Sequence, residues 1–125
     1  MGKNKLLGIW MDHSDAYLME LINGTIVTKS IVSETDHKER EDRWDGHEKG
    51  IHSKGKHQQL SYYKKIRDAI VEYQKVVIFG PTDAKHELFN ILQADHLFED
   101  ISIEVLNSDK MTESQMHTFV REYFH

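Results

Sequence analysis

A run of basic side chains has the clearest chemical character in this sequence. No acidic residue interrupts residues 49–67, where the bases are Lys49, Lys54, Lys56, Lys64, Lys65 and Arg67. Lysines neutralise phosphates, flexible glycines such as Gly55 let a backbone approach closely, and rings such as Tyr62 can stack on unpaired bases. The run therefore predicts an RNA-binding surface. The plainer interpretation is a solvated helix start whose tyrosines face the core.

Three carboxylates, Asp12, Asp83 and Asp109, each follow a predicted strand. In a layered α/β fold, carboxylates near strand ends could converge on two Mg²⁺ ions and cleave a phosphodiester. Each residue also has an ordinary explanation, because Asp12 lies in a turn and the other two precede helices. A metal-dependent nuclease is therefore an alternative function.

The predicted strand-to-helix turn at residues 80–85 offers free backbone amides to an anion. Gly80, Thr82 and Lys85 are the candidate contacts. The turn lacks the glycines of a phosphate loop or a dinucleotide fingerprint, so it is a candidate anion site and no more.

Histidines are unusually frequent, and His37, His47, His52 and His57 lie within one charged segment. Imidazole suits zinc, nickel or copper, but spacings of ten, five and five residues are not those of a preformed site. We expect no metal and no other cofactor. Protonation of all nine histidines would change the net charge from -5 to +4, so mild acid could reverse its sign.

Composition excludes several classes of protein. The 125 residues suit one domain, 1–125, and the absence of cysteine excludes a disulfide framework and a thiolate metal site. A net charge of -5 argues against coating nucleic acid with the whole surface. Apolar runs are far shorter than the roughly 20 residues of a membrane span. We expect a cytoplasmic protein that binds neither a membrane nor DNA.

Hydrophobic patterning predicts five strands and three helices. Strands are expected at residues 6–11, 16–22, 25–33, 76–79 and 101–106, with a hairpin at Asn23-Gly24. Helices are expected at residues 59–73, from Thr82 or Asp83 to 94, and from a capping box at Thr112 to 124. Residues 34–58 carry few apolar side chains and are predicted to form a long mobile charged loop. The order β-β-β-α-β-α-β-α predicts an α/β, ribonuclease-H-like layered fold, with a mixed five-stranded sheet and flanking helices.

Four segments also carry a resemblance to a known family. These are residues 7–13, 76–85, 109–116 and 120–124, which include Gly80-Pro81, Ala84-Lys85 and the Thr112 and Gln115 helix start. They resemble small bacterial translational machinery proteins related to the middle domain of the archaeal and eukaryotic peptide-chain release factor. The similarity covers nearly the whole chain except residues 34–50.

The resemblance implies a ribonuclease-H-like sandwich and a role at the ribosome. In the release factor a Gly-Gly-Gln tripeptide helps water attack the peptidyl ester. Gly55-Lys56-His57 stands at that position here, or Gln58 after a one-residue slip, so the paired glycines are missing. We therefore expect a non-catalytic module that binds the ribosome or ribosomal RNA through residues 49–67. A further alternative is a protein interaction module that self-associates as a homo-oligomer.

Overall fold

The computed structural model describes residues 5–33 and 48–124, with side chains described for residues 5–33 and 59–124. Its elements are β1 (Leu6–Met11), β2 (Asp15–Ile22), β3 (Thr25–Val32), α2 (Glu48–Ile70), β4 (Lys75–Gly80), α3 (Ala84–Gln93), the short 3₁₀ helix η2 (His96–Phe98), β5 (Ser102–Asn107) and α4 (Glu113–Tyr123). This order confirms the predicted β-β-β-α-β-α-β-α succession.

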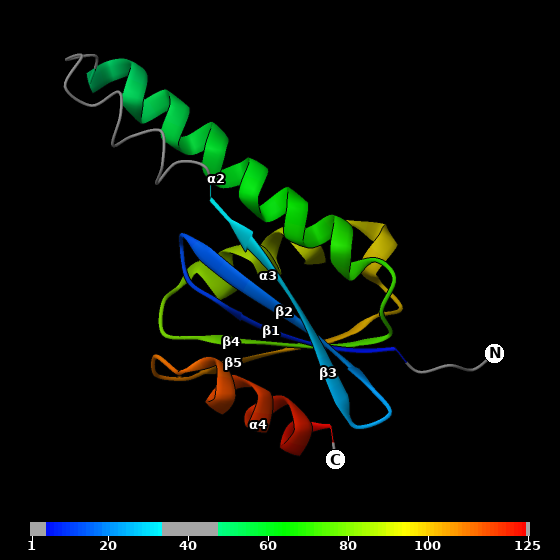
Figure 1. Ribbon diagram of the computed structural model, residues 1–125. Helices are drawn as coiled ribbons and strands as arrows, with labels where there is room; N and C mark the ends of the chain where they lie inside the picture. The colour runs from blue at the N-terminus through cyan, green and yellow to red at the C-terminus, as the bar shows by residue number, and fades with distance from the viewer. Residues whose placement is uncertain (1–4, 34–47, 125) are drawn as a thin grey trace.

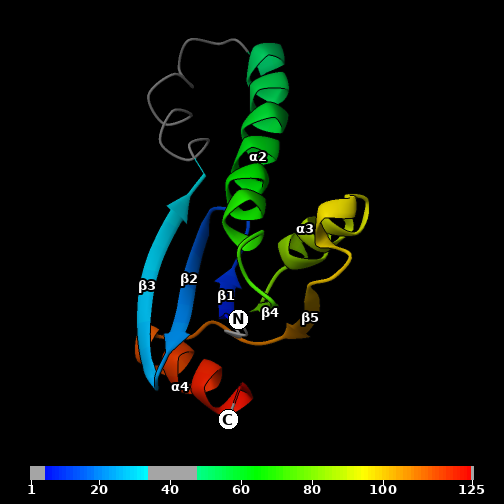
Figure 2. The same ribbon diagram turned by 90° about the vertical axis from the view of Figure 1, so that its right-hand side faces the viewer.

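The five strands form one mixed sheet in the order β3-β2-β1-β4-β5. β1, β2 and β3 are antiparallel neighbours, whereas β1 pairs with β4, and β4 with β5, in parallel. Helices α2 and α3 cover one face of the sheet and α4 covers the other (Figures 1 and 2). The fold is therefore the three-layered α/β arrangement that the sequence predicts.

Local residue choices explain the turns and helix starts. Asn23 and Gly24 have φ values of 51° and 83°, the positive values that a tight hairpin between β2 and β3 needs. Thr112 accepts from the Gln115 backbone N–H, and the Gln115 side chain accepts from the Thr112 N–H, so the predicted capping box opens α4. At α3, the Thr82 hydroxyl accepts from the Ala84 N–H at 3.2 Å, whereas Asp83 makes no side-chain cap bond.

The main correction concerns α2, which begins at Glu48 and not near residue 59. Residues 48–58 of the predicted loop are therefore helical, and residues 34–47 lie outside the described residues. The N-terminal half of α2 extends beyond the sheet (Figure 1). A helix that has no sheet beneath it needs no apolar stripe, which is why hydrophobic periodicity predicts only its second half.

Alternation along the buried strands divides the core between the two faces. Leu7 and Ile9 of β1 pack under α2 and α3, whereas Trp10 lies in the smaller cluster under α4. Gly8 also faces α4, because a Cβ at this position would lie 2.3 Å from Cγ2 of Val120. The missing side chain thus lets α4 lie close to β1.

Replacing Gly8 by alanine should therefore disturb the packing of α4. We expect Gly8→Ala to lower the free energy of unfolding by about 1–3 kcal/mol, measured by urea denaturation. In a Val120→Ala background the clashing methyl groups are absent, and the additional cost of Gly8→Ala should be smaller. An equal cost in both backgrounds would contradict this packing.

Candidate functional site

The predicted RNA-binding residues all belong to α2 and fall into four groups. Lys64 and Lys65 are exposed, whereas Tyr62 is buried. Arg67 is half-buried, and its guanidinium lies 3.2 Å from Asp68 and 3.8 Å from Asp95. The remaining predicted residues lie in the helix with side chains outside the described part: Lys49, Lys54, Gly55, Lys56, His57 and Gln58.

Tyr62 is the clearest correction among these residues. Its side chain is 1% exposed, and its hydroxyl donates to the carbonyl oxygen of Asp12 at 2.8 Å. The neighbouring Tyr63 is 3% exposed and packs in the same core cluster. The prediction that Tyr62 stacks on RNA is therefore wrong, because no face of its ring is open to a base.

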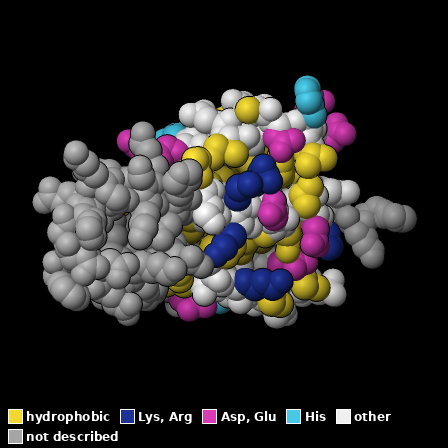
Figure 3. Space-filling model, turned by 90° about the horizontal axis from the view of Figure 1, so that it is seen from above, with side chains coloured by type: hydrophobic (Ala, Val, Ile, Leu, Met, Phe, Trp, Pro, Cys, Tyr) yellow, Lys and Arg dark blue, Asp and Glu magenta, His cyan; other side chains and the backbone are white. Residues whose placement is uncertain are grey.

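The surface around α2 carries mixed charge. Viewed onto the α2 side of the molecule, Lys and Arg side chains are separated by Asp and Glu side chains and by hydrophobic groups (Figure 3). Leu60 and Val71 are among the exposed hydrophobic residues of this region, at 54% and 43%. Within the described side chains, the basic character of α2 therefore depends chiefly on Lys64 and Lys65.

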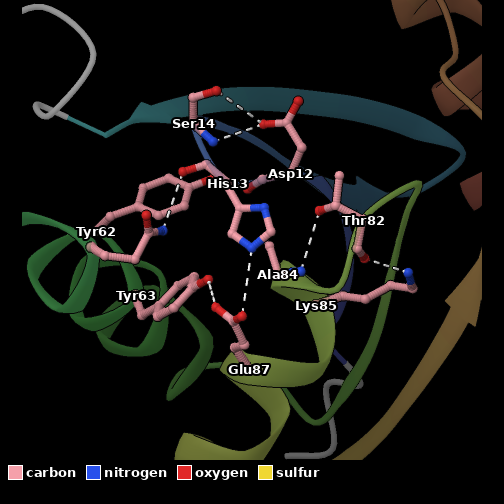
Figure 4. A network of polar contacts seen from close by, with 10 residues as sticks. Asp12, His13, Ser14, Tyr62, Tyr63, Thr82, Ala84, Lys85 and Glu87 are labelled. Carbon is pink, nitrogen blue, oxygen red and sulfur yellow. Dashed lines mark hydrogen bonds and ion pairs between the residues drawn. The ribbon is translucent and has the colours of Figure 1, made fainter. Parts of the chain in front are cut away.

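A polar network joins α2 to the turn between β1 and β2 and to the start of α3 (Figure 4). The Gln59 side-chain amide donates to the carbonyl oxygen of His13 at 3.2 Å. The Tyr63 hydroxyl donates to Oε1 of Glu87 at 2.5 Å, and Oε2 of Glu87 lies 3.6 Å from Nε2 of His13. Three segments distant in the sequence thus meet at the edge where the parallel strands β1 and β4 end.

Sequence reasoning missed three members of this network: Gln59, His13 and Glu87. The available signal was weak, since Gln59 lies one helical turn before Tyr63 and Glu87 lies in the first turn of α3. Burial raises the pKa of the Tyr63 hydroxyl above its usual range, and the hydrogen bond to Glu87 and its negative charge raise it further. Tyr63 therefore stays a hydrogen-bond donor throughout the physiological pH range.

The turn at residues 80–85 does not form the predicted anion site. Lys85 is 2% exposed, and its ammonium group donates to the carbonyl oxygen of Thr82 at 2.6 Å. The Thr82 hydroxyl accepts from the Ala84 N–H. Gly80 serves a close approach of two strands, because a Cβ there would lie 2.1 Å from the carbonyl oxygen of Met11. The polar groups that were expected to hold an anion instead bond within the turn.

The three strand-end carboxylates do not assemble a metal centre. Oδ1 of Asp12 accepts from the backbone N–H groups of Ser14 and Asp15 at 2.9 and 2.8 Å, which closes the turn after β1. Asp83 and Asp109 are exposed. Among residues 5–33 and 59–124, no group of three or more His, Asp or Glu side chains is placed to hold a metal ion. Asp12 therefore has the structural role that turn chemistry predicts.

The fold and the network define an α/β domain in which one long helix is tied to the carboxyl edge of a mixed sheet. Two solved structures share this fold. Pelota of Thermoplasma acidophilum superposes with a TM-score of 0.64 over 94% of this chain, at 14% sequence identity. Pelota of Archaeoglobus fulgidus gives a TM-score of 0.62 over 97%, at 8% identity. This chain spans 32% of each Pelota chain, about one third of its length.

These likenesses show a shared fold, in agreement with the fold that the resemblance to the release factor middle domain implied. No protein-family model matches the sequence, and no curated protein is similar to it in sequence. Within the described chain, none of the helices combines the length and the apolar character needed to cross a membrane.

The bond between Tyr63 and Glu87 gives a pH-dependent prediction. We expect Tyr63→Phe to lower the free energy of unfolding by about 1 kcal/mol at pH 7. In the unfolded chain the hydroxyl ionises near its ordinary pKa of about 10, whereas the folded protein holds its proton to higher pH. The wild type should therefore lose stability as the pH rises above about 10, and the difference from the variant should shrink.

Urea denaturation between pH 7 and 11 measures this difference. Glu87→Gln serves as the control background, because the variant removes the carboxylate that accepts the bond and repels the phenolate. Tyr63→Phe should cost less stability in that background. A difference that grows above pH 10 would contradict the assigned contact.

Proposed function

We propose that this chain is a non-catalytic RNA-binding module that acts in translation by contacting the ribosome with the exposed side of α2. The observation that carries the proposal is the anchoring of α2 by its buried tyrosines. Because Tyr62 and Tyr63 face the sheet, the neighbouring Lys64 and Lys65 are held on the solvent side. Both side chains are therefore exposed to solvent on a helix whose position is fixed by its buried side.

The length of α2 supports the same proposal. Its 23 residues form a helix about 34 Å long, and its N-terminal half extends beyond the sheet (Figure 1). Residues 49–67 contain no acid, although the whole chain has a net charge of -5. A projecting basic helix of this kind suits a groove lined by phosphates.

The comparisons support a translation-related role. The Pelota-like fold and the motifs that resemble the release factor middle domain point to the same class of protein. The chain lacks the paired glycines of the Gly-Gly-Gln tripeptide at residues 55–57. Peptide release by that tripeptide is therefore not part of the proposal.

The two alternative functions have less support. A nuclease would need Asp12, Asp83 and Asp109 around a metal, and the turn hydrogen bonds of Asp12 provide a sufficient role for it. Self-association as a homo-oligomer stays a prediction. The strands that could pair with a second copy are β3 and β5, because they are the edge strands of the sheet. Light scattering of the purified protein measures it.

Charge reversal on α2 tests the proposed contact. We expect Lys64→Glu combined with Lys65→Glu to weaken cosedimentation with ribosomes about tenfold at low salt, because two phosphate contacts become repulsive. The slope of log association constant against log salt concentration should fall by about two, near one for each lost contact.

A matched control is the combination of Lys29→Glu and Lys75→Glu. These lysines are also exposed but lie on β3 and β4, and the pair changes the net charge by the same amount. The control should keep most of the association and its salt slope. Equal losses in both double variants, at unchanged melting temperature, would contradict a contact through α2.

A further inference from the structure

A pocket of about 420 Å³ lies beside the outermost strand of the sheet, where α3, η2 and β5 meet. Its apolar lining comes from these elements and the residue before β5, and comprises Phe89, Leu92, Phe98, Ile101 and Ile103. Leu97, next to Phe98 in the sequence, is 67% exposed, more than any other large hydrophobic side chain in the described part of the chain. The pocket is therefore suited to an apolar side chain that comes from another molecule.

The outer edge of β5 offers backbone hydrogen bonds next to this pocket. β5 is the last strand on its side of the sheet (Figure 2), and no further strand pairs with it in the part of the chain that the structure describes. The Ser102 N–H donates to the carbonyl oxygen of Gln74, on the β4 side, at 2.9 Å. Successive residues of a strand direct their backbone groups to opposite sides, so Ile103 and Val105 direct theirs away from β4.

The chain around the pocket is acidic. Residues 86–109 contain six Asp and Glu residues and no Lys or Arg, and two of the acids, Asp95 and Glu99, belong to the lining. Arg67 lies 3.8 Å from Asp95, and Nδ1 of His96 lies 2.6 Å from Glu99. Even with both of these partners charged, the other carboxylates of the segment leave an excess of negative charge. This excess repels phosphates and attracts Lys and Arg side chains.

We propose that β5 and this pocket bind an extended, basic segment of a partner protein, which adds to the sheet as a further strand. Such a segment can exchange main-chain hydrogen bonds with Ile103 and Val105 at the open edge. Alternate side chains of a strand point to the same face, so an apolar side chain of the segment can enter the pocket on the face that Ile103 lines. Its Lys or Arg side chains supply the charge opposite to that of residues 86–109.

Charge distinguishes this partner from two others. RNA brings phosphates, and a second copy paired through β5 brings the same acidic segment, so each of them meets like charge. The site also goes beyond the proposed ribosome contact and does not rest on it, because the pocket is lined by residues 89–103, outside α2. Peptide binding is measured without ribosomes, so failure of one proposal leaves the other open to its own test.

Amide hydrogen exchange of the full chain, followed by nuclear magnetic resonance, tests the main-chain contact. The probe is the heptapeptide Lys-Val-Lys-Leu-Lys-Val-Lys with blocked ends, which alternates basic and apolar side chains. Binding should slow exchange at Ile103 and Val105 about tenfold, because their outward N–H groups gain an acceptor. Exchange at Glu104 and Leu106 should change little, since the N–H groups of these residues already face β4.

A charge variant and a second peptide test the side-chain contacts. Glu99→Lys should weaken binding of the heptapeptide about fivefold at low salt, because an attraction at the pocket becomes a repulsion. The matched change Glu122→Lys, at an exposed position on α4, alters the net charge equally and should leave the affinity unchanged. A heptapeptide with Ser and Thr in place of Val and Leu keeps its charge and should bind about tenfold more weakly, because it buries no apolar side chain.

The proposal is overturned if the first heptapeptide, at millimolar concentration, leaves exchange at Ile103 and Val105 unchanged in a protein that remains folded. It is also overturned if Glu99→Lys and Glu122→Lys behave alike, or if the two heptapeptides bind equally well. Protection of the two amides that depends on protein concentration and not on peptide would assign the edge to a second copy. Protection by an oligouridine and not by the heptapeptide would assign it to RNA, and either result would overturn the basic peptide.

Discussion

The hydroxyl of Tyr62 donates to the carbonyl oxygen of Asp12 and fixes how α2 is rotated about its own axis. Ile66 and Ile70, one and two turns further along, are both 0% exposed and hold the same side of the helix against the sheet. Each buried aliphatic side chain contributes roughly 1.5–3 kcal/mol, so rotation of α2 would cost far more than any single surface contact returns. The burial of this side therefore determines which side chains of α2 are exposed to solvent.

The sheet separates two surfaces with different chemistry. On one face, the solvent side of α2 carries Lys64 and Lys65 and suits phosphates. On the other face, a cavity beside α4 is lined by the carboxylates of Asp12, Asp15 and Glu113 and by the rings of Trp10 and Tyr17. Both surfaces depend on β1, whose alternate side chains pack under α2 and under α4. A change in the core of β1 would therefore disturb both.

Local sequence patterns predicted the fold well because the turns and helix starts that they indicate are stabilised by residues close together in the sequence. Asn23-Gly24 supplies positive φ values wherever a hairpin forms, and Thr112 with Gln115 closes a capping box without help from distant residues. The start of α2 at Glu48 was missed because its first half carries no apolar stripe. Hydrophobic periodicity indicates which side of a helix is buried, and the part of a helix that projects beyond the sheet has no buried side to produce that periodicity.

The candidate site was predicted less well, because it depends on which side chains distant segments cover. Helical spacing alone does not show whether Tyr62 faces RNA or the core. In the folded protein its hydroxyl donates to the carbonyl oxygen of Asp12, fifty residues earlier, and this contact holds the side chain in the core. The ammonium group of Lys85 bonds to Thr82 inside its own turn, and no sequence pattern distinguishes that from a lysine that awaits an anion. Lys64 and Lys65 are exposed, and their contact with RNA stays a prediction.

Site-specific photo-crosslinking tests whether the solvent side of α2 contacts ribosomal RNA. A photoreactive amino acid is placed at position 64 on the solvent side of α2 or, in a second protein, at position 122 on α4, and each protein is irradiated with ribosomes. We expect crosslinks to ribosomal RNA from position 64 and far fewer from position 122. Crosslinks from position 122 alone, or none from position 64 in a protein that cosediments with ribosomes, would contradict it.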